Sequence, residues 1–397
     1  MPRLDLAAHH RFLLEHGDAI ARQAITGDPD ADLPGLEVTV DAVHLRAGRD
    51  CTVGYRAVIG AGEERREEYL VATTADVTGQ VVTLDSEDYS FRVWVHPNDP
   101  VLTSAGQAFT PSVVAGWLEA AGVASGPVEL RALAYRPMRR AVLRADAAGG
   151  PWFVKVQRPR RHLEYLERMA LLAPVGLTPP VVAVPARGVT VTRAAEGVSL
   201  AVALAAWSME DAVEPDPNAL LGLLDRLPGG VRTLPAPRPC TERLDASVQA
   251  ALLELPARAS DIEGLRDRLL AAEADAVLGP VVPTHGDFYE ANVFTIDGRA
   301  TAMIDIESLG PGHLVDDLAC LMAHLLVLPD LSAAHYARLP GLIDRWQAFF
   351  GEVVDEPTLR SRAAGLVLGL LSGAGEFQAT LRLERALAWA AGEAAAP

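Results

Sequence analysis

Six polar residues fall within or beside one predicted β-hairpin, and they constrain the fold more than any other feature of the sequence. Two apolar, strand-like runs cover residues 291–296 and 300–306, and the strong turn signal Asp297-Gly298 joins them. The polar residues are His285, Asp287, Asn292, Asp305, Glu307 and Asp317. Acidic side chains this close together repel one another, so a cation is expected among them. Because oxygen ligands suit Mg²⁺ better than Zn²⁺, the hairpin predicts a magnesium site.

Length and composition indicate a folded protein of two or three domains. The chain has 397 residues, and half of them are hydrophobic, which excludes disorder as the overall description. Its longest apolar runs, such as residues 314–328, are interrupted by Asp316, Asp317 and His324. We therefore predict no transmembrane helix. The N-terminus lacks a cationic start followed by an apolar core and a cleavage site, so we predict no signal peptide.

Charge and cysteine content narrow the partners and the compartment. With 35 Lys and Arg against 52 Asp and Glu, the net charge is −17. This argues against general binding to nucleic acid or to anionic lipid, but it says little about a local basic pocket. Cys51, Cys240 and Cys320 are odd in number and far apart, which fits reduced thiols better than disulfides or a zinc site. We predict a cytoplasmic protein.

Residues 1–125 are predicted to form an α/β domain of their own. Helical spacing over residues 4–26 leads into a loop and then into a series of strands. These strands are predicted at 36–45, 51–59, 68–75, 80–85 and 90–95. Thr110-Pro111 predicts a helix start with an N-cap hydroxyl and a proline in the first position.

The remainder predicts a β-rich segment followed by a mostly helical one. Strands are predicted at 128–135, 141–145, 152–157, 181–184 and 188–192, with a helix over 160–172. From residue 199 onward the pattern is mostly helical, interrupted by the proline-rich stretch 227–240. Residues 331–396 predict three or four packed helices.

A weak internal repeat links the two β-rich segments. Residues 41–58 align with residues 131–148, and each copy consists of a strand, a basic turn and a second strand, followed by a third strand. In this alignment Thr73 stands opposite Lys155. Any two β-hairpins can look alike, so duplication and coincidence both stay open.

Lys155 lies in an apolar strand signal, where its charge needs a partner if it is buried. Glu164 and Glu167 follow on one face of the next predicted helix. Taken alone, an edge-strand lysine that points to water is the commoner explanation. A strand lysine, a helix glutamate, an Asp-plus-Asn loop and a second Asp are, however, the parts of a phosphoryl-transfer site. Asp287, Asn292 and Asp305 supply the later parts in the right order.

The segment HGDFYEANV, residues 285–293, resembles the HGDxxxxN catalytic loop of the aminoglycoside phosphotransferase/choline kinase superfamily. The segment IDIE at 304–307 and the downstream Asp317-Leu318-Ala319 are similar to the metal-binding strand and structural aspartate of that superfamily. Gly310 and Gly312 lie between them. The resemblance covers about residues 126–397.

The resemblance implies an α+β, bilobal protein-kinase-like fold. A small β-rich N-lobe would cover residues 126–195, and a large helical C-lobe would cover 196–397. Some relatives, maltokinases among them, carry an N-terminal cap domain, and residues 1–125 are a candidate for such a cap.

The resemblance also implies ATP and Mg²⁺ as cofactors and assigns roles around the reacting centre. Asp287 would be the catalytic base, and Asn292 and Asp305 would be metal ligands. His285 and Asp317 would support the loop. Glu307 would be either a third metal contact or a solvated acid beside the site, and both stay open.

On the nucleotide side, Lys155 would contact the phosphates. Its partner would be Glu167, with Glu164 as the second candidate. Residues 192–197 resemble the hinge between the lobes, so Thr192, Arg193 and Ala195 are candidates for binding adenine through the backbone.

The sequence departs from the usual kinase pattern at the expected phosphate-covering loop. Residues 135–140, YRPMRR, contain no glycine, so their backbone cannot approach phosphates as closely. Arg136, Arg139 or Arg140 could contribute charge instead. A solvated basic turn is the alternative for each of them.

These observations predict an ATP- and Mg²⁺-dependent phosphotransferase that acts on a hydroxyl of a small molecule. A sugar, an aminoglycoside-like compound or another natural-product alcohol is the expected acceptor, and no nucleic-acid or membrane partner is expected. One alternative is a Ser/Thr peptide kinase that docks its substrate on residues 36–96. Another is a nucleotide-binding pseudokinase scaffold, against which the intact set of site residues argues.

Overall fold

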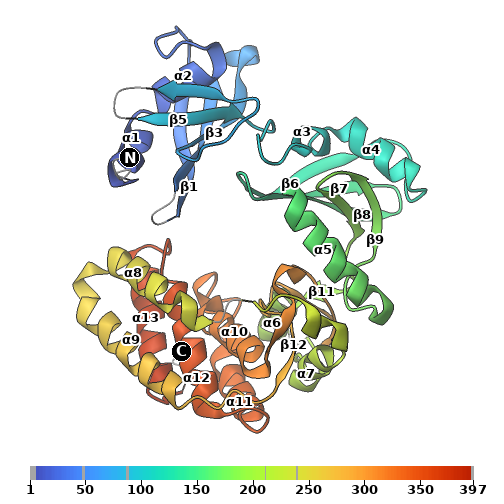
Figure 1. Cartoon of the computed structure of the whole chain (residues 1–397). Coiled ribbons are helices and arrows are strands. Elements are labelled where there is room, and N and C mark those ends of the chain that lie inside the picture. Colours follow the sequence, from blue (N-terminus) through green and yellow to red (C-terminus); the bar gives the residue numbers. More distant parts are fainter. Residues whose placement is uncertain (1–5, 47–49, 86–88, 211, 238–239, 395–397) are drawn as a thin grey trace. The chain divides into compact units, whose positions relative to one another are not determined.

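The computed structural model describes residues 6–46, 50–85, 89–210, 212–237 and 240–394. Contacts divide the chain into two compact units, residues 1–163 with 181–194 and residues 164–180 with 195–397 (Figure 1). The first unit is rich in strands and the second is mostly helical, so the protein belongs to the predicted α+β class. The division into domains at residues 125 and 195 stays a prediction.

The first sheet is antiparallel, with the strand order β1-β2-β3-β5-β4. Its strands are β1 (Glu37–Arg46), β2 (Asp50–Ile59), β3 (Arg66–Thr73), β4 (Val82–Asp85) and β5 (Ser90–Val95), close to the predicted ranges. Helices α1 (Leu6–Glu15) and α2 (Gly17–Thr26) bury Leu13 and Ile20 against alternate apolar side chains of this sheet. The helical pattern over residues 4–26 therefore forms two helices, which meet at His16.

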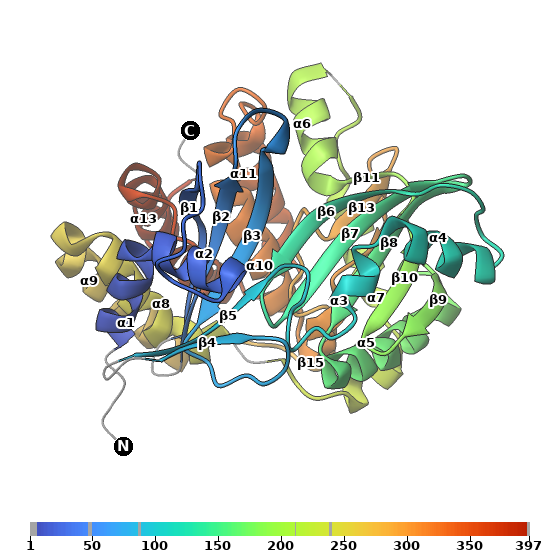
Figure 2. The same ribbon diagram turned by 90° about the horizontal axis from the view of Figure 1, so that it is seen from above.

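The second sheet has the strand order β6-β7-β8-β10-β9 and is also antiparallel. Its strands are β6 (Glu129–Arg136), β7 (Arg140–Ala147), β8 (Gly150–Gln157), β9 (Val181–Ala186) and β10 (Val189–Arg193). Helices α3 (Ala105–Ala108) and α4 (Pro111–Ala120) cover one face and bury Val114 and Leu118 against Trp152 and Val154. Figure 2 shows each helix pair beside its own sheet.

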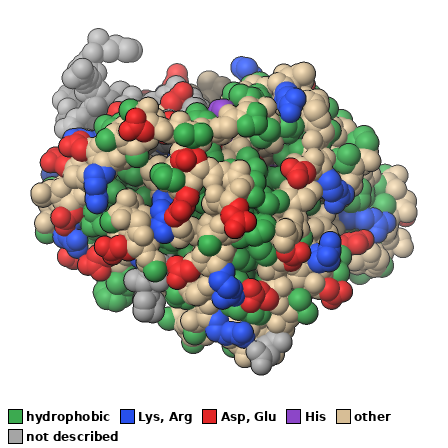
Figure 3. Space-filling view, turned by 90° about the horizontal axis from the view of Figure 1, so that it is seen from below, with side chains coloured by type: hydrophobic (Ala, Val, Ile, Leu, Met, Phe, Trp, Pro, Cys, Tyr) green, Lys and Arg blue, Asp and Glu red, His purple; other side chains and the backbone are tan. Residues whose placement is uncertain are grey.

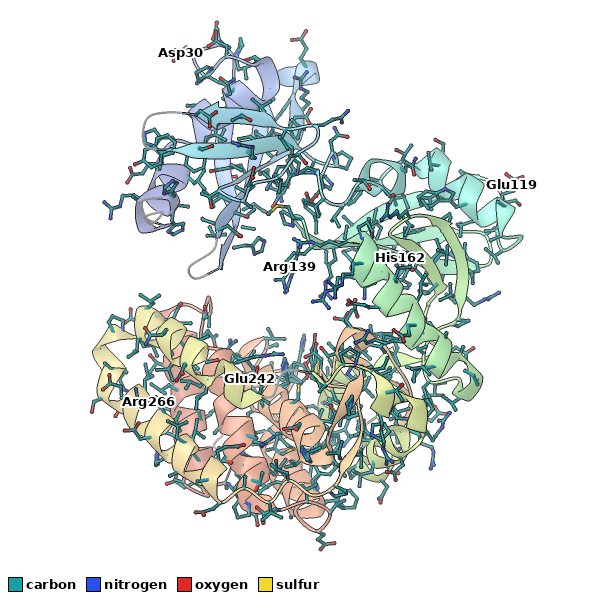
Figure 4. The ribbon with its side chains drawn as sticks, viewed as in Figure 1. Asp30, Glu119, Arg139, His162, Glu242 and Arg266 are labelled. Carbon is teal, nitrogen blue, oxygen red and sulfur yellow. The ribbon has the colours of Figure 1, made fainter. Side chains whose placement is uncertain are left out.

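Thr110 and His162, at helices beside the second sheet, make hydrogen bonds that the sequence did not predict. Thr110 precedes α4 as predicted, but its hydroxyl donates to the carbonyl of Gly106 at 2.7 Å instead of capping the helix. Helix α5 (Pro159–Leu172) is anchored by His162, which is labelled in Figure 4. Its Nδ1 accepts from the amide of Gly188 at 3.1 Å, and its Nε2 lies 2.9 Å from the hydroxyl of Thr190.

The second unit is a helical body around α10 (Leu314–Val327). Its other helices are α6 (Leu200–Glu210), α7 (Pro217–Asp225), α8 (Leu244–Glu254), α9 (Ala259–Ala274), α11 (Leu339–Gly351), α12 (Glu356–Gly369) and α13 (Glu376–Ala390). Helix α10 packs against α11 and α12 and buries most of its side chains. The helices predicted over residues 331–396 are α11, α12 and α13.

The hairpin on which the sequence analysis centred is present in the second unit. Strands β13 (Val293–Ile296) and β14 (Arg299–Met303) pair, with β11 (Val198–Ser199) on the far side of β13. Asp297 and Gly298 have φ of 49° and 74°, the left-handed backbone that a tight two-residue turn requires. Strand β14 ends at Met303, three residues before the predicted end.

Among the described residues, no helix has both the length and the apolar character needed to cross a membrane. On the face drawn in Figure 3, acidic and basic side chains are interspersed. Cys51 is buried, and Cys51 and Cys320 are free thiols. The side chain of Cys240 lies outside what the structure describes.

Candidate active site

The loop that carries the HGD sequence is held by a carboxylate beneath it. The loop leaves β12 (Val281–Thr284), which pairs with β15 (Gly310–His313). Asp317 on α10 accepts the amide N–H of His285 at 2.7 Å and that of Gly286 at 2.8 Å. Burial raises the pKa of Asp317 to about 7, and the two N–H bonds oppose this shift. The carboxylate fixes the direction in which the chain leaves β12.

His285 ties the same loop to the end of the hairpin. Its ring is fully buried, and burial lowers its pKa to about 4, so the imidazole is neutral at pH 7. Nε2 lies 2.9 Å from the carbonyl oxygen of Ile304. Because a carbonyl can only accept, the ring proton resides on Nε2.

Gly286 is required by a close approach of two chain segments. Its φ is +76°, and a Cβ placed there would lie 2.4 Å from the carbonyl oxygen of Ser308. No other residue type fits without moving the backbone. The loop therefore passes directly against the segment after β14, and the half-buried Asp287 follows immediately.

The hairpin brings the three candidate reacting residues to one end. The side-chain N–H of Asn292 donates to the backbone carbonyl of Asp287 at 3.0 Å. The backbone carbonyl of Asn292 accepts from the amide N–H of Ile304 at 2.9 Å. Asp305 is the next residue, with φ 58° and ψ 47°. It lies beyond β14 in a left-handed turn, a conformation that Asp tolerates, and not on the strand as predicted.

The donor set fits Mg²⁺. Since the amide nitrogen of Asn292 points to Asp287, its side-chain oxygen is the atom that can face a cation beside the Asp305 carboxylate. Within the described part of the chain, no three His, Cys, Asp or Glu side chains form a metal-binding group. Mg²⁺ does not need such a group, because it retains water and binds phosphate oxygens together with one or two carboxylates.

A cavity of about 470 Å³ opens beside Asp287 within the second unit. Its lining includes Glu273 of α9, Asp316 of α10 and Arg362 of α12. Arg362 is buried and bonds to both acids, with Nη2 at 2.8 Å from Glu273. The volume lies in the range of small-molecule sites, roughly 300–1,000 Å³.

Sequence reasoning missed these three lining residues because they lie on separate helices and form no motif. Arg362 gave no clear signal either, because Arg360 and Ser361 precede it on the same helix.

Lys155 lies on β8, which is the central strand of the second sheet. It pairs with Val142 on β7 and Thr190 on β10, so the edge-strand alternative is wrong. Its neighbours Val154 and Val156 face the core under α3 and α4, and Lys155 lies on the opposite face.

The remaining nucleotide-side candidates lie near the points where the chain changes unit. On α5, Glu164 is half-buried and Glu167 is exposed. Thr192 and Arg193 end β10, where the Arg193 guanidinium lies 5.0 Å from the centre of the Trp152 ring. Ala195 is the first residue of the next segment of the second unit. Glu307 is half-buried in the turn after Asp305.

A loop aspartate, an asparagine five residues later and a second aspartate just after the paired strand are the residue set from which the sequence analysis predicted a kinase-type phosphotransferase. Residues 139–349, more than half of the chain, match the model of the phosphotransferase enzyme family, and the chain belongs to that family. The predicted protein-kinase-like fold and the class of enzyme, a small-molecule kinase with an alcohol acceptor, are thereby confirmed.

Solved structures with similar folds include antibiotic and choline kinases. A thermostable mutant of aminoglycoside phosphotransferase APH(4)-Ia, in a ternary complex with ADP and hygromycin B, is 17% identical with a TM-score of 0.46, covering 69% of this chain and 96% of that chain. A choline/ethanolamine kinase family protein from Mesorhizobium loti is 20% identical with a TM-score of 0.47, covering 72% and 94%. Choline kinase LicA from Streptococcus pneumoniae is 13% identical with a TM-score of 0.40, covering 71% and 98%. No protein with a curated description matches.

Proposed function

We propose that the protein transfers the γ-phosphoryl group of ATP, with Mg²⁺, to a hydroxyl group of a small polyhydroxylated molecule. The observation that carries this proposal is the cavity lined by Asp287, whose backbone carbonyl accepts from the Asn292 side chain. The acceptor would bind in that cavity.

In the proposed reaction, the acceptor oxygen bonds to the γ-phosphorus while the bond from that phosphorus to the ADP oxygen breaks. Asp287 orients the hydroxyl and takes its proton. Asn292 and Asp305 would hold Mg²⁺, which neutralises charge on the phosphates when bound. Most of the rate enhancement would come from positioning and electrostatics.

Three residues would keep this centre in shape. Asp317 and His285 bond the loop at both of its sides, and Gly286 permits the close approach to Ser308. Glu307, which is half-buried, would be either a third metal contact or a solvated acid beside the site.

Lys155 would contact the phosphates, and Thr192, Arg193 and Ala195 would hold adenine. The partner of Lys155 would be Glu167, with Glu164 as the second candidate. Residues 1–125 would be the cap, 126–195 the N-lobe and 196–397 the C-lobe. A cytoplasmic location without nucleic-acid or membrane partners belongs to the same proposal.

The charges of the cavity support a neutral or cationic acceptor. Four acidic side chains line it, those of Glu273, Asp287, Asp316 and Asp317, against the arginines Arg243 and Arg362. An anionic acceptor would meet net repulsion. Carboxylates can accept a hydrogen bond from a hydroxyl group, and guanidinium groups can donate one to it. Sugars and aminoglycoside-like compounds have this character.

An acceptor screen tests the proposal. Sugars, aminoglycosides, other alcohols, sugar acids and Ser/Thr peptides would be compared by ADP release with ATP and Mg²⁺. We expect turnover above the acceptor-free rate with an uncharged or amino-bearing polyol. Turnover with peptides or sugar acids alone would contradict the proposed acceptor class, and no ATP turnover with any acceptor would contradict the reaction.

A further inference from the structure

The two sheets of the first unit follow one plan. Each has its strands in the order first, second, third, fifth, fourth, and each follows a pair of helices. A bulge interrupts the first strand of each, at Val40/Ala42 and at Ala132/Ala134. The second sheet differs by the insertion of α5 between its third and fourth strands. This shared plan favours duplication over coincidence as the origin of the sequence repeat.

The pairing register identifies the position in the first sheet that corresponds to Lys155. Thr52 pairs with Thr73 in the first sheet as Val142 pairs with Lys155 in the second. Thr73 is buried, and its hydroxyl lies 2.8 Å from that of Thr52. The first sheet therefore has a threonine, and no lysine, at the position where Lys155 would bind phosphate. The face of the first sheet that carries Thr73 can thus have a different role.

That face of the first sheet holds the turn between β6 and β7. Val71 and Trp94 form a buried cluster with Met138, and these side chains are 0%, 2% and 3% exposed. The indole N–H of Trp94 lies 3.3 Å from the hydroxyl oxygen of Tyr135. The turn is the glycine-free segment that the sequence analysis assigned to covering the phosphates.

Asp99, in the connection between the two sheets, is the polar centre of this contact. It is 3% exposed. Its Oδ1 accepts the amide N–H groups of Val101 and Leu102, both at 2.9 Å. Its Oδ2 accepts the hydroxyl of Tyr135 at 2.9 Å and the amide of Met138 at 2.7 Å. Oδ1 thus holds the connection between the two sheets, and Oδ2 holds the β6–β7 turn.

The turn needs such support because its backbone is unfavourable. Met138 has φ 59°, which costs a non-glycine residue roughly 1–2 kcal/mol. Arg158 donates to the Met138 carbonyl, so both polar groups of this residue are bonded. Met138 is buried, whereas Arg136 and Arg139 on either side are exposed. Figure 4 labels Arg139 at this end of the unit.

We propose that Asp99 is a positioning residue for the nucleotide. It fixes the β6–β7 turn in a conformation from which Arg136 and Arg139 can contact the ATP phosphates beside Lys155. Lys155 pairs with Val142, two residues from the start of β7, which is roughly 7 Å along the strand. A phosphate chain spans such a distance. A turn already ordered by Asp99 loses little entropy when ATP binds. The inference rests on the proposed function.

Asp99→Asn tests the proposal with little other change. The Asn side-chain oxygen can still accept from Val101 and Leu102, but its NH₂ group faces the Met138 amide, where no hydrogen bond can form. We expect the Kd and KM for ATP to rise roughly 10-fold, as for loss of a hydrogen bond to a charged group. The kcat and the acceptor KM should change less than about threefold. Hydrogen exchange at the Met138 amide should accelerate in the nucleotide-free protein.

Tyr55→Phe is the matched control. It removes a buried hydrogen bond of 2.7 Å to the Leu13 carbonyl, in the core under α1 and α2 of the same unit. It should lower stability and leave the ATP Kd and Met138 exchange unchanged. Tyr135→Phe removes one of the two donors to Oδ2 and should raise the ATP Kd about two- to threefold. It serves as the test if Asp99→Asn does not fold.

The outcomes separate this inference from the proposed function. An unchanged ATP Kd in a folded Asp99→Asn protein with fast Met138 exchange would overturn the inference alone. An equal rise in ATP Kd in Tyr55→Phe would also overturn it, because general destabilisation would then explain the effect. Wild-type protein that neither binds nor turns over ATP would overturn the proposed function, and the inference with it.

Discussion

At the scale of single residues, Arg362 both lines the cavity and contributes to the stability of the second unit. Its side chain is 4% exposed and forms ion pairs with both Glu273 and Asp316. Arg362→Met keeps an unbranched apolar stem but removes the guanidinium, which leaves two partly buried carboxylates without this partner. We expect a loss of about 3 kcal/mol in the free energy of unfolding and at least a fivefold higher acceptor KM with the ATP KM unchanged. Urea unfolding and steady-state kinetics measure these quantities.

Arg345→Met is the control for that substitution. Arg345 lies on α11 and pairs with Glu214 at 2.8 Å, but both side chains are exposed, at 55% and 42%. Exposed pairs contribute at most about 1 kcal/mol, so this variant should behave nearly as wild type. If both variants shifted the acceptor KM equally, the assignment of Arg362 to the acceptor wall would be contradicted.

The predictability of individual residues depended on whether their partners were close in the sequence. Asp287, Asn292 and Asp305 were recognisable because one hairpin fixes their spacing. Asp99 and Arg362 were not, because their partners lie up to 89 residues away in the chain. Only the folded structure brings such groups together.

At the scale of elements, the entry into the catalytic loop depends on glycine. Gly286→Ala would place a Cβ against the Ser308 carbonyl, 2.4 Å away, at a φ of +76°. We expect a destabilisation of about 2–4 kcal/mol, or a displaced Asp287 with turnover reduced at least 100-fold. Thermal unfolding and ADP release would report either result.

Gly264→Ala is the matched control for that element. Gly264 lies inside α9, where an added Cβ meets nothing within 4 Å. Alanine should stabilise the helix by up to about 1 kcal/mol without changing kinetics. A Gly286→Ala protein as stable and active as Gly264→Ala would show that the close approach at Ser308 does not constrain the loop.

Elements were predicted well where pattern and turn chemistry agreed. The strands of the first sheet follow alternation, and Asp297-Gly298 marks the hairpin turn. The deviations occur where tertiary contacts compete with local preference. Strand β14 ends early because Asp305 turns into the left-handed region, and the Thr110 hydroxyl bonds back to Gly106 in α3.

At the scale of the whole molecule, Glu290 couples stability to pH. It is 6% exposed, and Oε2 lies 4.0 Å from Nδ1 of His324. Burial raises the pKa of Glu290 to about 7 and, with Arg382 nearby, lowers that of His324 to about 4. Between these values both side chains are neutral, so the pair is not an ion pair.

The sign of the Glu290 effect follows from proton binding. The folded protein binds a proton at Glu290 more tightly than the unfolded chain, so this residue lowers stability as pH rises from about 4.5 to 7. Glu290→Gln should therefore gain about 2–3 kcal/mol relative to wild type between pH 5 and pH 8. Urea unfolding at both pH values measures this. A difference between the two proteins that does not vary with pH would contradict the raised pKa.

The chain as a whole combines a family core with two sheets of the same strand order. The resemblance of residues 126–397 to kinases was visible from the sequence because the catalytic loop is a local motif. The similarity of the two sheets was visible in the sequence only as a weak repeat, since strand pairing allows many side chains at each position. The structure adds that both sheets have the same strand order.

The most direct test of the central claim compares Asp287→Asn with wild type in the presence of ATP, Mg²⁺ and an acceptor found in the screen. We predict that kcat falls roughly 10²–10⁴-fold, the contribution typical of a general base, while the ATP Kd stays within about threefold of wild type. An Asp287→Asn protein that turned over as fast as wild type would contradict the assignment of Asp287 as the base and the site built around it.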